Sequence, residues 1–180
     1  MTNCIEVRGL CKSYGDFALK DVDLTLPGGS ILGLIGENGA GKTTVIKCIL
    51  NLIHRDAGTI RLLGYDNVKE ERLAKEDVGI VLDECFFHDN LRPRDVGRIL
   101  APSFHTWDEA LFRNYLDKFG LPEKKLIKEF SRGMKMKLSL SAALAHRPKL
   151  LILDEATAGL DPVVRDEILD EFLGFIRDED

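Results

Sequence analysis

The stretch GENGAGKTT at residues 36–44 restricts the possible folds of this chain more strongly than any other part of it. Its letters match the pattern G-x-x-x-x-G-K-[ST]. The stretch follows an apolar run, residues 31–35, that is typical of a strand buried on both faces, and it precedes a helix expected over residues 42–52. In this strand–loop–helix context the pattern predicts a phosphate-binding loop rather than a glycine-rich turn without a ligand.

Each residue type in this loop has a physical reason. Glycines let the backbone wrap closely, so that successive N–H groups face phosphate oxygens. The start of the following helix adds its positive dipole end. Lys42 is expected to reach the β- and γ-phosphates, and Thr43 is expected to hold magnesium through its hydroxyl. The predicted nucleotide-binding loop comprises Gly36, Glu37, Asn38, Gly39, Ala40, Gly41, Lys42, Thr43 and Thr44.

Two carboxylates follow a second apolar run, in the stretch LLILDEATAGLD at residues 150–161. A buried strand here delivers Asp154 and Glu155 at its carboxyl end, where open α/β sheets bind ligands. Asp154 is suited to hold magnesium, usually through a water. Glu155 is suited to polarise the water that attacks a γ-phosphate. Two solvated acids in a turn are the alternative, which the upstream phosphate loop disfavours.

The composition is that of an ordinary globular chain. Its 180 residues suffice for one domain with a substantial core and are few for two. The formal net charge of −5 argues against nucleic acid as the main partner. No apolar run approaches the roughly 20 residues that cross a bilayer, so a membrane role must act through a partner. Because no CxxC spacing occurs, we expect reduced thiols rather than zinc ligands at Cys4, Cys11, Cys48 and Cys85.

Periodicity predicts an α/β core with a helical insertion. The first thirty residues alternate as strands do. Further strand signals lie at residues 59–63, 78–82 and 150–153. Helical signals lie at residues 96–100, 108–119 and 133–145. A last helix begins at Asp161 and Pro162, with a side-chain cap and a proline at its first position. The apolar stripe of this helix is Val164, Ile168, Phe172 and Ile176.

These motifs together resemble those of the ATP-binding-cassette (ABC) ATPases, the nucleotide-binding subunits of transporters, and the resemblance extends from Ile5 to about Phe175. It implies an α/β P-loop NTPase core with an N-terminal antiparallel β subdomain and an inserted α-helical subdomain. It assigns residues 1–83 and 147–180 to the core and residues 84–146 to the helical subdomain. ATP and Mg²⁺ are the implied ligands.

Two more site residues are implied by this resemblance. In the family an aromatic residue well before the phosphate loop stacks on adenine, and CKSYGDFALKDV places Tyr14 there, although an ordinary tyrosine at a strand edge is the alternative. The stretch AGLD resembles the family's D-loop, which implies that Asp161 faces a partner subunit.

The stretch FSRGMKMKL falls where the family carries its signature motif. Ser131 and Gly133 match that motif, and the resemblance implies that they contact the γ-phosphate held by the other subunit of a head-to-tail dimer. Ser131 also suits a plain helix cap, and the two roles are compatible. For Lys135 and Lys137 we expect a solvated basic face, because charge runs usually are solvated.

Two substitutions depart from the family pattern. A glutamine usually ends the strand at residues 78–82, where this chain has Asp83 followed by Glu84. A carboxylate can still reach magnesium directly or through water, so we expect an altered metal dependence rather than a loss of binding. Ala156 replaces the common proline after the two acids and leaves both carboxylates in place.

A third departure concerns histidine. Family members continue into a strand that carries a histidine contacting the γ-phosphate, whereas His54, His88, His105 and His146 all precede Asp154. The sequence ends in GFIRDED, with acids at a helix carboxyl end, where the dipole disfavours them. We therefore expect a fragment that binds ATP and hydrolyses it poorly.

The resulting interpretation is the ATPase subunit of an ABC transporter. It implies Mg²⁺-dependent hydrolysis at the interface of a homo- or heterodimer, a separate integral membrane permease, no nucleic acid, and a cytoplasmic position at the inner face of the membrane. Similarity to exporter ATPases favours export. Phe86 and Phe87 are candidate contacts with the permease or parts of the core. The alternatives are a non-transport ABC ATPase and an ATP-sensing module with little turnover.

Overall fold

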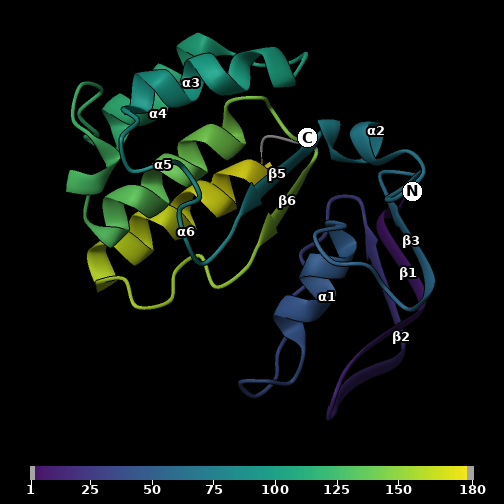
Figure 1. Ribbon diagram of the computed structural model, residues 1–180. Helices are drawn as coiled ribbons and strands as arrows, with labels where there is room; N and C mark the ends of the chain where they lie inside the picture. Colours follow the sequence, from purple (N-terminus) through teal and green to yellow (C-terminus); the bar gives the residue numbers. More distant parts are fainter. Residues whose placement is uncertain (1–2, 178–180) are drawn as a thin grey trace. The chain divides into compact units, whose positions relative to one another are not determined.

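The computed structural model describes residues 3–177 and the side chains up to residue 175 (Figure 1). The chain divides between Glu76 and Asp77 into two compact units. Ile176, the last residue of the expected apolar stripe, has its side chain outside this description, and so do the three terminal acids. In the described part of the chain no helix combines the length and apolar character that crossing a membrane requires.

The first unit contains a four-stranded antiparallel sheet in the order β2-β1-β3-β4. In the central strand Ile5 and Val7 are buried, and Val7 pairs with Leu24 on one side and Ile60 on the other. This confirms the period-two alternation read from the sequence. The strands are β1 (Asn3–Tyr14), β2 (Phe17–Pro27), β3 (Ala57–Leu62) and β4 (Tyr65–Asp66).

Two helices pack on this sheet. The first, α1 (Lys42–Ile49), directly follows the phosphate loop and contacts β3. It buries Val45, Ile46, Cys48 and Ile49, so its apolar face is the one turned toward the sheet. The second, α2 (Glu71–Glu76), contacts β3 and β4.

The strand expected at residues 31–35 is absent from the described structure, and this prediction was wrong. The segment forms no strand, and Ile35 is 98% exposed. A strand needs a neighbour for its backbone N–H and C=O groups. The sheet of the first unit has β2 and β4 at its edges and includes no part of this segment, so apolar character alone does not produce a strand.

The second unit is built around a parallel pair, β5 (Val78–Val81) and β6 (Leu150–Leu153). Helix α5 lies against β5, and α3 and α4 pack on α5 (Figure 1). Short 3₁₀ turns occur at Ala101–Ser103 and Ile127–Glu129. The helices are α3 (Pro93–Leu100), α4 (Glu109–Lys118), α5 (Arg132–Leu144) and α6 (Pro162–Arg177). Their positions confirm the helical signals of the sequence.

Side-chain caps begin three of these helices. Asp108 accepts a hydrogen bond from the Leu111 N–H at 2.9 Å at the start of α4. Ser131 caps α5 and Asp161 caps α6 in the same way, at 3.2 and 3.1 Å. The caps at Ser131 and Asp161 confirm the side-chain caps predicted from the sequence. Each side chain accepts a hydrogen bond from an N–H that has no partner within its helix.

Candidate functional site

The phosphate loop has a backbone that only glycine adopts easily. Gly39 and Gly41 have φ angles of 84° and 97°, and the Ala40 N–H donates to the Glu37 carbonyl at 3.1 Å, which closes a turn. At Gly41 a Cβ atom would lie 2.7 Å from carbon atoms of Phe17 and Leu19 in β2. The last glycine of the motif is therefore required both by its dihedral angle and by the close approach of the sheet.

Lys42 folds back over the loop that precedes it. Its Nζ donates to the carbonyl oxygens of Gly36 and Glu37 at 2.8 and 2.9 Å. Because α1 begins at Lys42, the helix start and the ammonium group belong to the same loop. Backbone N–H groups at a helix start and one cation form an arrangement that suits an anion such as phosphate.

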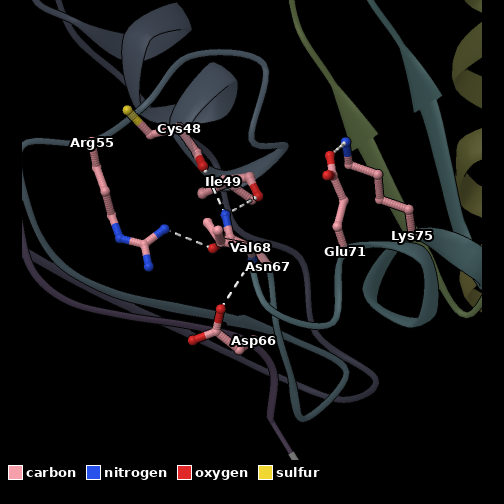
Figure 2. Close-up of polar contacts among 8 residues, drawn as sticks. All are labelled: Cys48, Ile49, Arg55, Asp66, Asn67, Val68, Glu71 and Lys75. Atoms are coloured by element: carbon pink, nitrogen blue, oxygen red, sulfur yellow. Dashed lines mark hydrogen bonds and ion pairs between the residues drawn. The ribbon is translucent and has the colours of Figure 1, made fainter.

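The opposite end of α1 is held by a buried asparagine that the sequence analysis did not identify. Asn67 Nδ2 donates to the carbonyl oxygens of Cys48 and Ile49 at 2.9 and 2.8 Å, and its Oδ1 accepts from Arg55 Nη1 at 2.8 Å (Figure 2). Arg55 Nε also donates to the Gly58 carbonyl at 2.9 Å. The last carbonyls of the loop-bearing helix are thus satisfied by the β3–β4 region.

Tyr14 ends β1 in the same unit as the phosphate loop. It pairs in register with Phe17, so the two side chains lie on the same face of the sheet. Phe17 in turn lies close to the loop, since a Cβ atom at Gly41 would be 2.7 Å from Phe17 Cζ. Tyr14 as a whole residue is 47% exposed, so part of its surface is accessible to a ligand. The adenine-stacking role that the resemblance implies for Tyr14 stays a prediction.

The predicted carboxylates lie together in the second unit, at the carboxyl end of the parallel strand pair. Val81 pairs with Leu153, so Asp83 and Glu155 each come two residues after a paired position. The Asp154 N–H donates to the Val81 carbonyl at 3.0 Å, and the Asp154 side chain is buried whereas Glu155 and Asp83 are exposed. Asp83 and Asp154 follow neighbouring strands, which is compatible with the predicted binding of both to one metal ion.

Glu155 has an unusual backbone. Its φ of 49° lies in the left-handed region, and its carbonyl accepts from the Ala158 N–H at 2.9 Å. A residue with a Cβ atom pays a steric penalty in this region, and such strain concentrates at functional sites.

The start of α5 packs tightly on the stretch that carries Asp161. A Cβ atom at Gly133 would lie 3.3 Å from Val164 Cγ1, and one at Gly159 would lie 2.9 Å from Arg132 Nη1. Gly159 also has a φ of 68°. The structure therefore brings Ser131, Gly133 and Asp161 into one continuous surface of the second unit.

The lysines of α5 form ion pairs, and for Lys137 this contradicts the predicted solvated basic face. Lys135 pairs with Asp89 at 2.8 Å, and Lys137 pairs with Glu167 of α6. The Lys137 side chain is only 12% exposed, and its ammonium lies 5.7 Å from the centroid of the Phe119 ring. A solvated basic face is thus wrong for Lys137, because the acidic partner comes from a helix that the spacing of α5 does not reveal.

Phe86 and Phe87 have different surroundings. Phe86 is 72% exposed, whereas Phe87 packs against the core of the second unit. Phe86 therefore has more surface available for contact with a partner than Phe87, which is only partly buried. Within the described residues no disulfide bond joins any of the four cysteines.

The residues present are compatible with magnesium bound beside a nucleotide. Across the described residues no three His, Cys, Asp or Glu side chains converge as a complete metal site. Mg²⁺ commonly takes only one or two carboxylates and draws its other ligands from phosphates and water. The buried carboxylate of Asp154 in the second unit and the hydroxyl of Thr43 in the first are each of a chemical type that fits this requirement.

Comparison with protein families agrees with the loop, the carboxylates and the capped α5. The family model described as "ABC transporter" matches residues 19–158. The chain belongs to the ABC transporter family. This match includes the phosphate loop, the start of α5 and both acids of the β6 turn, and it leaves only Tyr14 and Asp161 among the predicted site residues outside its limits.

Relatives of this ABC chain include three bacterial ATP-binding proteins. ABC transporter ATP-binding protein YtrB of Bacillus subtilis (strain 168) is 34% identical over 177 residues, which are 98% of this chain and 60% of the relative. Linearmycin resistance ATP-binding protein LnrL of the same organism is 37% identical over 92% of this chain and 55% of the relative. Bacitracin transport ATP-binding protein BcrA of Enterococcus faecalis is 36% identical over 93% of this chain and 56% of the relative. The chain thus spans less than two thirds of the length of these relatives.

Solved structures support the same fold. A structure described as the ATP-binding subunit of an ABC transporter superposes with a TM-score of 0.86 at 27% identity, over 97% of this chain and 75% of that chain. The cbiO1 protein of Clostridium perfringens is described as part of the ABC transporter complex cbiONQ. It superposes with a TM-score of 0.78 at 25% identity, over 99% of this chain and 75% of that chain. The predicted P-loop NTPase fold of the ABC type is confirmed.

Proposed function

We propose that this chain is the ATP-binding and ATP-hydrolysing part of an ABC transporter. The observation that carries the proposal is the geometry of the phosphate loop. Two glycines in the left-handed region, the start of α1 and the Lys42 ammonium share one short loop. A triphosphate is the ligand that such an arrangement suits best.

Within this function each predicted residue has a role. Lys42 exchanges its carbonyl partners for the β- and γ-phosphates, and the backbone N–H groups of residues 36–44 hold the remaining oxygens. Tyr14 stacks on adenine. Thr43 of the first unit and Asp154 and Asp83 of the second are the residues that would hold magnesium, which would neutralise phosphate charge when bound.

Glu155 orients the attacking water and accepts its proton. The water oxygen bonds to the γ-phosphorus, the bond to the bridging oxygen breaks, and ADP leaves. The left-handed backbone of Glu155 supports this role, because such a conformation persists only where the surrounding structure maintains it, and these conformations cluster at active sites.

The assembly is part of the same proposal. Two ATPase subunits, identical or different, pack head to tail, so that Ser131 and Gly133 reach the γ-phosphate held by the partner and Asp161 faces that partner. Residues 84–146 form the helical subdomain and residues 1–83 and 147–180 the core. A separate membrane permease holds the dimer at the cytoplasmic face, with Phe86 as a candidate contact.

Export is the favoured direction. The relatives BcrA and LnrL carry names that refer to bacitracin transport and to linearmycin resistance, both of which suit the removal of a toxic compound. The acidic net charge of −5 supports a protein partner rather than nucleic acid.

Substitution of Lys42 by methionine tests the proposal at its centre. Lys42→Met removes the cation and keeps a side chain of similar length, so we expect the Kd for Mg-ATP, measured by isothermal titration calorimetry, to rise by at least about tenfold. Lys47→Met, an exposed lysine on the same helix, is the matched control and should bind ATP as the wild type does. A wild-type chain that binds no ATP, or a Lys42→Met chain that binds it equally well, contradicts the proposed function.

A further inference from the structure

One face of the Tyr14 ring is already covered by a lysine. Lys12 and Tyr14 are alternate residues of β1, so their side chains lie on the same face of the sheet. The Lys12 Nζ lies 5.0 Å from the centroid of the Tyr14 ring, within the range of a cation–π contact. The exposed part of the ring is therefore the part that the ammonium does not cover.

Lys12 is held in this position by Asp56, which immediately precedes β3. Its Nζ donates to Asp56 Oδ1 at 2.9 Å, and the Lys12 side chain is only 14% exposed. The second carboxylate oxygen accepts from the Ser13 N–H at 2.7 Å. The Asp56 N–H donates to the Cys11 carbonyl at 2.8 Å. Asp56 is thus bound to three consecutive residues of β1.

The two side chains keep each other charged. The hydrogen bond with Asp56 raises the pKa of Lys12, and the hydrogen bonds from Lys12 and from the Ser13 backbone lower the pKa of Asp56. Near neutral pH the ammonium beside the ring is therefore a stable feature of the site.

We propose that Lys12 and Asp56 are positioning residues for adenine: they cover one face of Tyr14 and restrict its rotation, so that the base stacks on the opposite face of a ring already in place. This inference rests on the proposed function, since it needs ATP as the ligand. Its physical basis is preorganisation, because a ring that is fixed before binding loses less conformational entropy when the base arrives.

Two other roles for Lys12 predict different behaviour. A lysine that contacts the phosphates directly contributes equally to ATP and to tripolyphosphate, which has no base. A lysine that only braces β1 against β3 affects stability and neither ligand. The ratio of the two ligand affinities therefore distinguishes the positioning role from both.

The test measures the Kd of Mg-ATP and of Mg-tripolyphosphate by calorimetry on the wild type and on Lys12→Met. The expected result is a two- to fivefold weaker ATP affinity, which corresponds to about 0.5–1 kcal/mol for ordering a ring that is no longer fixed before binding, with tripolyphosphate binding unchanged. Lys12→Arg, which keeps the cation over the ring, should restore ATP binding. Lys20→Met, an exposed lysine on β2, should change neither Kd.

A second variant protects the test against misfolding. Asp56→Asn keeps the lysine and weakens its hydrogen bond, and it should lower ATP affinity in the same selective way. In a Tyr14→Leu background, Lys12→Met should have no additional effect, because no ring remains to be positioned. Equal losses for both ligands, or no loss for ATP, overturn the inference while the proposed function stands. A wild type that binds tripolyphosphate and ATP equally well also overturns it, whereas one that binds neither overturns the proposed function.

Discussion

Glu155 combines a proposed catalytic carboxylate with a backbone φ of 49°, which glycine adopts at no steric cost. We expect Glu155→Gly to raise the free energy of unfolding by about 0.5–1 kcal/mol, since it removes the Cβ atom from the left-handed region. The same change should abolish phosphate release from ATP, because the group that accepts the proton of the attacking water is lost. Urea denaturation and a phosphate-release assay measure the two effects.

Glu155→Gln separates strain from chemistry. It keeps the Cβ atom and removes the carboxylate, so the unfolding free energy should stay within about 0.5 kcal/mol of the wild-type value while hydrolysis is lost. If glycine at this position destabilises the chain as much as it would in an ordinary turn, the backbone of Glu155 carries no strain.

Helix α1 begins directly after the phosphate loop, and the carbonyl groups at its carboxyl end accept hydrogen bonds from Asn67 (Figure 2). Asn67→Asp keeps the shape of the side chain and the acceptor for Arg55, and it replaces two N–H donors by a charge that faces the negative end of a helix. The side chain is fully buried. We therefore expect a loss of unfolding free energy on the order of 3 kcal/mol, measured by urea denaturation.

Asn114→Asp provides the matched comparison, since Asn114 is exposed on α4. The same chemical change there should alter the unfolding free energy by less than about 0.5 kcal/mol. Comparable stabilities for the two variants would mean that the hydrogen bonds of Asn67 to α1 do not stabilise the helix.

Local patterns predicted most elements of this chain, because they depend on spacing within one segment. The caps at Ser131 and Asp161 and the apolar alternation of β1 belong to this class. Contacts between distant segments were missed for the opposite reason. Lys12 and Asp56 are separated by 44 residues, so no periodicity connects them. The strand expected at residues 31–35 failed likewise, since a strand requires a neighbour that its own sequence does not specify.

At the scale of the whole molecule, the proposed dimer places Lys42 of one subunit and Ser131 of the other at the same ATP. Ser131 also caps α5 within its own subunit, which complicates its replacement by alanine. Ser131→Asp avoids this problem, because aspartate caps a helix as well as serine does. Its negative charge should repel the γ-phosphate of the partner's nucleotide.

Subunit mixing therefore tests the head-to-tail arrangement, with Glu155→Gln in every chain to retain ATP. Neither Lys42→Met nor Ser131→Asp alone should retain ATP in dimers separated by size-exclusion chromatography. An equimolar mixture should retain about a quarter of the wild-type amount, since half of the dimers are mixed and each has one intact site. Lys42→Met mixed with the Lys42→Met/Ser131→Asp double variant forms no intact site and is the control. If the first mixture retains no more ATP than this control, Lys42 and Ser131 serve a site within one subunit, and the head-to-tail dimer is wrong.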